Sequence, residues 1–181
     1  MSHGWQGERV RLVPLDRARH LENSLRWIND PEVTAHTLLG DKPMGRLAEE
    51  EFFAQQEKGD PHSVVFAIET HAGEHIGLSG LHRIEPRHGV ASTGSLIGPR
   101  EMWGRGHGTD SVRVRTRYAF EVLNLRLLLS NVHAGNERSH RMLLRAGYEE
   151  CGRIPQRYWK RGRYEDSILL MLSRAKWEAM K

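Results

Sequence analysis

The sequence predicts one domain of the α/β or α+β class, built on a mixed sheet. Segments with strand-like alternation are interleaved with segments of helical periodicity along the chain. No repeat, low-complexity stretch or linker divides the 181 residues, and a chain of this length can bury a core. We therefore expect residues 1–181 to form a single domain.

Turn signals and glycines set the expected limits of the elements. Asn29-Asp30-Pro31 and Gly59-Asp60-Pro61 end two helical segments, and Gly147 is a typical helix C-cap. Gly94 lies inside an apolar stretch, which suggests a bulge or a close approach of other backbone. Strands are expected at 8–15, 63–70, 75–82, 90–97, 126–133, 148–154 and 164–172, and helices at 16–29, 46–58, from the glycine-rich stretch to about 124, and 137–146.

Composition narrows the class of protein. The hydrophobic content of 38% and the absence of any apolar run of spanning length predict a cytoplasmic protein without a membrane partner. The one cysteine, Cys151, excludes an internal disulfide and is expected to be a small buried side chain. No metal is expected, because no Cys/His cluster or H-E-x-x-H motif occurs. A net charge of +4 favours an anionic partner, such as nucleic acid, an acidic protein or a phosphorylated cofactor.

The stretch GPREMWGRGHGTDS places Gly104, Gly106 and Gly108 between a strand and a helix. Glycine permits positive φ and a close approach of ligand to backbone, and helix N-termini bind phosphate. One interpretation is a pyrophosphate cradle made by the amides of residues 105–109; the other is a glycine turn without a ligand. The pattern matches neither the dinucleotide-binding G-x-G-x-x-G nor the P-loop.

A basic helix face follows Asn136. Arg138, Arg141 and Arg145 recur at helical spacing, so they share one face, and one of them reaching a phosphate would support the cradle. Otherwise they form a solvated surface. A different face of this helix is expected to carry Ser139, Met142, Leu143 and Ala146 inward.

Taken together, these residues resemble the GNAT acetyltransferase superfamily, and within it the RimJ/RimL-like branch, which acetylates protein N-termini and small amines. RLVPL…LRWINDPEV, MWGRGHGTDS, NERSHRMLLRAGYEECG and GRYEDSILLMLSRAKW carry the resemblance, in this order, over nearly the whole chain. It implies an α+β GNAT fold with a mixed, mostly antiparallel central sheet of about seven strands flanked by helices. The parallel strands near 92–98 and 126–133 would splay apart at the acetyl-CoA site.

The resemblance also implies which residues hold acetyl-CoA as a co-substrate. The pantetheine arm would pair with the backbone near Leu96 and Ile97, and the pyrophosphate would lie on the amides after Gly104. The expected cofactor-binding residues are Leu96, Ile97, Arg105, Gly106, His107, Gly108, Thr109, Asn136 and Arg141.

The catalytic groups are less directly implied. Many members of the superfamily have a tyrosine seven residues after the helix-opening asparagine, where this chain has Leu143. The RimL-like branch has a serine at the third residue after it, so Ser139 is expected to protonate or contact the leaving thiolate, or else to bond locally within the helix.

At the two positions where the family often has a glutamate as general base, this chain has Asn131 and Ser92. The remaining polar candidates for the general base are His82, Glu85 and His133. Both histidines have an ordinary pKa near neutrality, which suits proton removal, and we select His82. A water chain is the alternative.

The resemblance thus implies an N-acetyltransferase that moves the acetyl group of acetyl-CoA directly to a primary amine, on a protein N-terminus or a small molecule. Trp27, Tyr158 and Trp159 would line the acceptor site, form a contact in a homodimer or lie in the core. Arg115, within the apolar stripe of its helix, would reach a carboxylate, a phosphate or water. The alternative function is a nucleic-acid- or ribosome-associated module that keeps the fold without catalysis.

Overall fold

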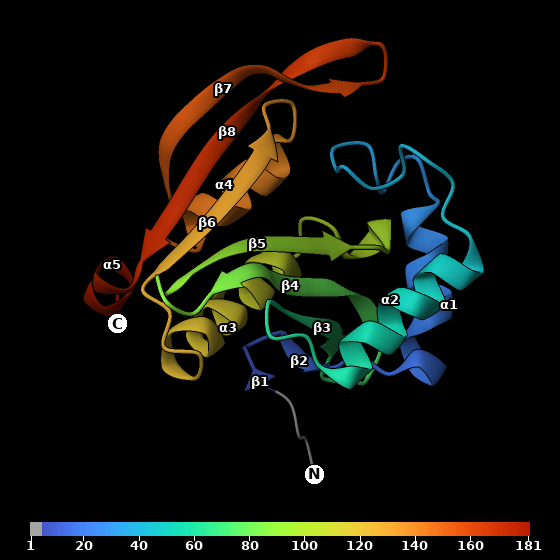
Figure 1. Ribbon diagram of the computed structural model, residues 1–181, viewed down its shortest axis with the longest axis horizontal. Helices are drawn as coiled ribbons and strands as arrows, with labels where there is room; N and C mark the ends of the chain where they lie inside the picture. Colours follow the sequence, from blue (N-terminus) through green and yellow to red (C-terminus); the bar gives the residue numbers. More distant parts are fainter. Residues whose placement is uncertain (1–4) are drawn as a thin grey trace.

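An eight-stranded sheet forms the centre of the protein in a computed structural model that describes residues 5–181 (Figure 1). The strands are β1 (Trp5–Gln6), β2 (Val10–Pro14), β3 (Ser63–Thr70), β4 (His75–Glu85), β5 (Val90–Ile97), β6 (Leu127–His133), β7 (Glu149–Lys160) and β8 (Arg163–Ser173). They lie in the order β1-β2-β3-β4-β5-β6-β8-β7. Seven strands were expected, and the short β1 is the additional one. The hairpin of β7 and β8 is longer than expected.

The helices are α1 (Arg17–Ile28), α2 (Arg46–Lys58), α3 (His107–Glu121), α4 (Glu137–Arg145) and α5 (Arg174–Ala179), with a 3-10 turn at Arg100–Met102. Alternation along β3 shows how they are placed. Phe66 and Ile68 pack with Val114 of α3, whereas Val65 and Ala67 pack with Leu21 of α1 and with α2. Helix α3 therefore covers one face of the sheet, and α1 with α2 the other. None of the helices between residues 5 and 181 is long and apolar enough to cross a membrane.

The sheet is open at one seam. Every neighbouring pair of strands is antiparallel except β5 and β6, which run parallel and pair only from Val90↔Leu127 to Ser92↔Leu129. Beyond that point β6 stays paired with β8 as far as His133↔Ser167. In Figure 1, β6, β8 and β7 rise away from the rest of the sheet. The predicted mixed sheet with splayed parallel strands is confirmed.

The bulge suggested at Gly94 is wrong. The β4–β5 register runs without a shift from Gly77↔Ile97 to His82↔Ser92, and the irregularity falls between His82 and Glu85. The space for the His82 ring depends on the register partner Gly80 instead. A Cβ on Gly80 would lie 2.4 Å from Nε2 of His82, whereas a Cβ on Gly94 would lie at an ordinary contact distance of 3.7 Å from the same atom.

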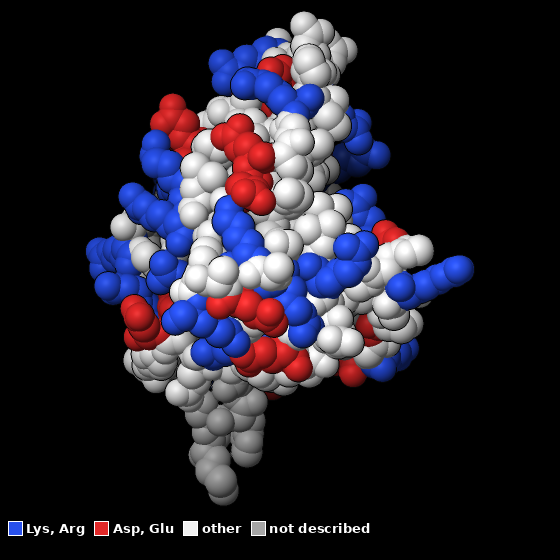
Figure 2. Space-filling model, turned by 90° about the vertical axis from the view of Figure 1, so that its left-hand side faces the viewer, with Lys and Arg blue, Asp and Glu red and all other residues white. Residues whose placement is uncertain are grey.

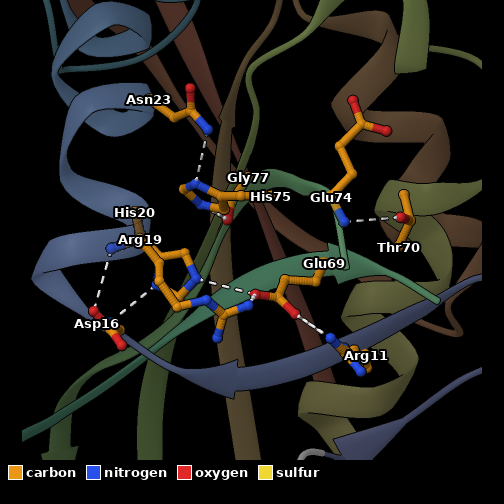
Figure 3. A network of polar contacts seen from close by, with 10 residues as sticks. All are labelled: Arg11, Asp16, Arg19, His20, Asn23, Glu69, Thr70, Glu74, His75 and Gly77. Carbon is orange, nitrogen blue, oxygen red and sulfur yellow. Dashed lines mark hydrogen bonds and ion pairs between the residues drawn. The ribbon is translucent and has the colours of Figure 1, made fainter. Parts of the chain in front are cut away.

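A buried ionic network fixes α1 against the sheet (Figure 3). Glu69 on β3 is fully buried, and its carboxylate accepts hydrogen bonds from Arg11, Arg19 and His20. Burial would raise the pKa of Glu69, but the hydrogen bonds from His20 and Arg11 and the charge of Arg19 bring it below its ordinary value. The network holds α1 so that Trp27 packs on Gly98, where β5 ends; a Cβ on Gly98 would lie 1.9 Å from the indole.

Cys151 is exposed, so the expected burial is wrong. It lies on β7, at the edge of the sheet, where the register with β8 shifts between Glu150 and Gly152. The alternation of β7 therefore does not carry this side chain into the core.

Candidate active site

Two of the three glycines are required by backbone conformation. Gly104 has φ 74° and Gly106 has φ 88°, values that favour glycine. Together they turn the chain so that α3 begins at His107. The backbone N–H groups of residues 105–109 have no hydrogen-bond partner among residues 5–181. The turn therefore presents a set of free donors at the positive end of a helix, which suits a phosphate.

Gly108 serves close packing instead. A Cβ at this position would lie 2.7 Å from Sδ of Met142 on α4. The absence of a side chain lets α3 approach α4, and the two helices enclose one cavity between them and β5.

This cavity, which we call the cofactor cavity, has a volume of about 350 Å³. It brings together the glycine turn, the end of β5 and the basic face of α4. Of the residues expected to bind the cofactor, those that line it are Leu96, Ile97, Gly106, Gly108, Thr109, Asn136 and Arg141, with Arg138 and Arg145 beside them. The side chains of Arg105 and His107 do not line it, and Nδ1 of His107 lies 3.2 Å from the carbonyl oxygen of Met102.

Two side chains in the wall of the cofactor cavity contact each other, and the sequence did not predict this contact. The guanidinium of Arg138 stacks 3.8 Å from the centre of the Trp103 ring, and Nε1 of Trp103 donates to the carbonyl oxygen of Ile97 at 2.7 Å. The indole of Trp103 therefore occupies the carbonyl oxygen of Ile97, a backbone group of β5 that faces the open seam.

The ladder shows which backbone groups of β5 face that seam. The amide of Gly98 donates to Ile76 of β4, so by antiparallel alternation Leu96 and Gly94 also pair toward β4. The N–H and C=O groups of Ser95 and Ile97 point the other way, toward β6. The sequence suggested Leu96 and Ile97 together; alternation favours Ser95 and Ile97 as the residues whose backbone is available there.

A second cavity, the acceptor cavity, lies on the other side of β5 and has a volume of about 530 Å³. It is bounded by α1, α2, the strands β3 to β6, α4 and the segment 36–39. The two cavities meet where β5 and β6 separate. The residues that line both are Thr37, Ser95, Leu96, Asn136, Ser139 and Met142.

Asn136 and Ser139 form the opening turn of α4. The Asn136 side chain accepts from the Ser139 amide at 3.1 Å and caps the helix. The Ser139 hydroxyl has no hydrogen-bond partner among residues 5–181 and borders both cavities. The local hydrogen bond within this turn therefore uses the serine backbone and leaves the hydroxyl available.

His82 lines the acceptor cavity from β4. Its Nδ1 lies 3.3 Å from Oγ of Ser63, and its Nε2 lies above Gly80 and Gly94. Burial lowers the pKa of His82, and the positive charges of Arg115 and Arg83 lower it further. The imidazole is therefore neutral at pH 7 and can accept a proton.

His133 also lines the acceptor cavity, from β6. Its ring stacks on Tyr158 with centroids 4.2 Å apart, and Nδ1 lies 3.4 Å from Oε2 of Glu165 without hydrogen-bond geometry. Burial lowers the pKa of His133, although Glu165 opposes this. Glu85, the other candidate base, is exposed and does not line the cavity.

The sequence did not reveal the position of Arg115. It is buried and reaches none of the partners expected for it; it donates instead to the carbonyl oxygen of Gly94 and to Oγ of Ser95, each at 2.6 Å. It fixes β5 at the point where the two cavities meet. Its place in the apolar stripe of α3 was the available signal.

The aromatic residues separate into three environments. Tyr158 lines the acceptor cavity, Trp27 is buried beside His75, and Trp159 is 60% exposed on the β7–β8 hairpin. Of these three residues, Tyr158 is the one that lines the candidate site.

Comparison with solved structures supports the fold. The fold matches that of spermidine N-acetyltransferase from Vibrio cholerae in complex with CoA and spermine, with a TM-score of 0.85 over 93% of this chain and 98% of that chain at 22% identity. Identity at this level shows the fold alone.

The family follows from the sequence match. Residues 9–149 match the model described as Acetyltransferase (GNAT) domain, so the chain belongs to this family. Spermidine N(1)-acetyltransferase of Escherichia coli (strain K12) is 26% identical over 165 residues, covering 90% of this chain and 85% of that protein. The N-acetyltransferase YoaA of Bacillus subtilis (strain 168) is 32% identical over 89 residues, or 49% of this chain. That match spans half of YoaA.

Proposed function

We propose that this protein is an acetyl-CoA-dependent N-acetyltransferase of the RimJ/RimL-like branch, acting in the cytoplasm on a primary amine. The observation that carries the proposal is the meeting of two cavities at the open seam of the sheet, with Ser139 bordering both. One cavity has free backbone donors and arginines for a phosphorylated cofactor. The other, larger cavity would accommodate an acceptor.

The cofactor would bind in the cofactor cavity with its pyrophosphate on the amides of residues 105–109 and Arg141 beside it. The pantetheine arm would extend along β5, pairing with backbone groups of Ser95 and Ile97, which brings the thioester to Ser139. The hydrogen bond from Trp103 to Ile97 would then be exchanged for one with the ligand.

The transfer requires a neutral amine, a polarised carbonyl and a proton for the thiolate. In our proposal Nε2 of His82 takes the proton of the amine, and Ser63 accepts a hydrogen bond from Nδ1–H, which keeps Nε2 free. A β5 amide polarises the thioester carbonyl. The amine nitrogen forms the new bond to the acyl carbon, the carbon–sulfur bond breaks, and Ser139 or water protonates the leaving thiolate.

The acceptor cavity, with a volume of about 530 Å³, has room for a small amine. The nucleic-acid alternative receives less support. Lys and Arg side chains on the face in Figure 2 are interrupted by groups of Asp and Glu. Elsewhere arginines are paired within the chain, among them Arg46 with Glu22 and Arg153 with Asp166.

The test is calorimetric titration of the protein with acetyl-CoA and with CoA, followed by an amine screen that detects released thiol. We expect binding that is lost in Gly106→Val, because a β-branched residue is strained at φ 88° and its side chain meets Arg9. The matched control is Gly45→Val, since a Cβ at Gly45 has open space and its φ is negative. No binding of either ligand, together with salt-dependent nucleic-acid binding, would overturn the proposal.

A further inference from the structure

One carboxylate in the acceptor cavity has no partner. Glu49 on α2 is 2% exposed, and its side chain forms no hydrogen bond or ion pair with any residue from 5 to 181. Oε1 is completely buried. Burial of an unpaired carboxylate is unfavourable, and it raises the pKa of Glu49. A cation that entered the cavity would provide the missing partner.

Glu49 lies away from the place where the cavities meet. The residues common to both cavities come from β5, α4 and Thr37, whereas Ala48, Glu49 and Phe52 of α2 line the acceptor cavity alone. A group held at Glu49 is therefore separate from the one that meets the thioester.

The wall that shares the cavity with Glu49 is apolar, and its residues include Ile28, Leu39, Phe52, Val65 and Leu78. Among the residues of 5–181 that line the cavity, Glu49 is the sole carboxylate. The other ionisable groups there are His36, His82, His133, Arg115 and Tyr158, none of which attracts a cation as an ion-pair partner. The cavity thus offers one site for a positive charge and an apolar path beside it.

We propose that Glu49 binds an ammonium group of the acceptor other than the amine that reacts, so that the acceptor is a diamine with an apolar spacer. This rests on the proposed function, because it concerns the same cavity. Pairing with the ammonium favours the ionised form of the Glu49 carboxyl, so binding of the diamine releases a proton wherever that carboxyl is protonated in the free protein. The reacting amine lies at the other end of the spacer, near His82 and Ser139.

The experiment compares α,ω-diaminoalkanes of increasing length with the matching n-alkylamines. Binding to the CoA-loaded protein is measured by calorimetry in two buffers of different ionisation enthalpy, and acetylation by thiol release. We expect one diamine to bind at least about thirtyfold more tightly than its matched monoamine, because one ammonium pairs with Glu49 while the second amine occupies the reacting end of the cavity.

Glu49→Gln should abolish this preference, while the affinity for CoA stays unchanged. Glu51→Gln is the matched control, since Glu51 lies on the same helix and is exposed. Equal binding of diamines and monoamines by the wild-type protein would overturn the inference, as would a preference for spermidine over every diamine, because its additional charge has no carboxylate here. The binding arm does not depend on turnover, so absent acetylation would count against the proposed function alone.

Discussion

Two buried glutamates in this protein have opposite surroundings. Glu69, under α1, has both carboxylate oxygens bonded, to Arg11, Arg19 and His20. Glu49, in the acceptor cavity, has neither oxygen bonded within residues 5–181. The histidines follow the same division: Nε2 of His75 lies 3.0 Å from the carbonyl oxygen of Gly77, whereas Nε2 of His82 faces the cavity. The hydrogen-bonded carboxylate of Glu69 holds the fold, whereas the unpaired carboxylate of Glu49 lies where a ligand is expected.

The largest effect is expected when the carboxylate of Glu69 is removed. Glu69→Ala leaves His20 and two arginines around an empty position, and we expect the free energy of unfolding to fall by roughly 3–5 kcal/mol. The loss should be near the lower limit, because Arg19 is half exposed and regains water. Urea denaturation measures it. A loss below about 0.5 kcal/mol, the range of ordinary surface substitutions, would show that the network does not stabilise the fold.

His75 makes the same region sensitive to acid. Burial, followed by the nearby His20, lowers the pKa of His75 to about 4 from 6.5. The unfolded state therefore binds more protons, and stability falls as the pH drops from 6.5 toward 4, by about 3 kcal/mol in total. Thermal unfolding across this range measures the loss. His75→Gln should flatten the slope, and an equally steep slope in the variant would assign the effect to other groups.

A smaller effect is expected at His82, which lines the acceptor cavity. His82→Ala should lower kcat/KM about a hundredfold, the contribution typical of a positioned base. It should also remove the acid limb of the pH profile, which lies below pH 6.5 because the pKa of His82 is lowered. His62→Ala is a suitable control, since His62 is exposed, lies with Nδ1 3.0 Å from the carbonyl oxygen of Ile84 and does not line the cavity. An unchanged profile in His82→Ala would move the base to His133 or to water.

The smallest effect has the opposite sign to the first. The pKa of Glu49 is raised by burial, so the stability linked to it is present below pH 4.5 and is lost as the pH rises through the folded-state pKa. Glu49→Gln should therefore raise the free energy of unfolding at pH 7, by about 1 kcal/mol. Denaturation at pH 4 and pH 7 tests this. Destabilisation comparable with that of Glu69→Ala would mean that Glu49 is a structural residue.

Local sequence signals predicted the elements well but not the contacts across the seam. Asp16 and Gly147 set the ends of helices within a residue or so, because capping depends on neighbours in the chain. The GNAT motifs led to the cofactor cavity for the same reason. Glu49 gave a weak signal, since it lies four residues before the buried Phe53 and so on the buried face of α2.

Contacts between segments far apart in the sequence could not be predicted from these local signals. The stacking of Arg138 on Trp103 joins α4 to the glycine turn, and the bonds of Arg115 join α3 to β5. The exposure of Cys151 depends on a register shift between two strands. Each depends on tertiary packing, which a periodic pattern along one segment does not encode.

The seam between β5 and β6 makes the cofactor part of the architecture. Three paired positions join the two halves of the sheet, and beyond them the backbone of β5 is left with an indole from Trp103 as a partner. A pantetheine arm that takes that place would act as an additional strand, provided by the ligand and not by the polypeptide. By mass action, a ligand present at a hundred times its Kd adds about 2.7 kcal/mol to the stability of the folded state. The lifetime of this protein in the cell would then follow the supply of acetyl-CoA.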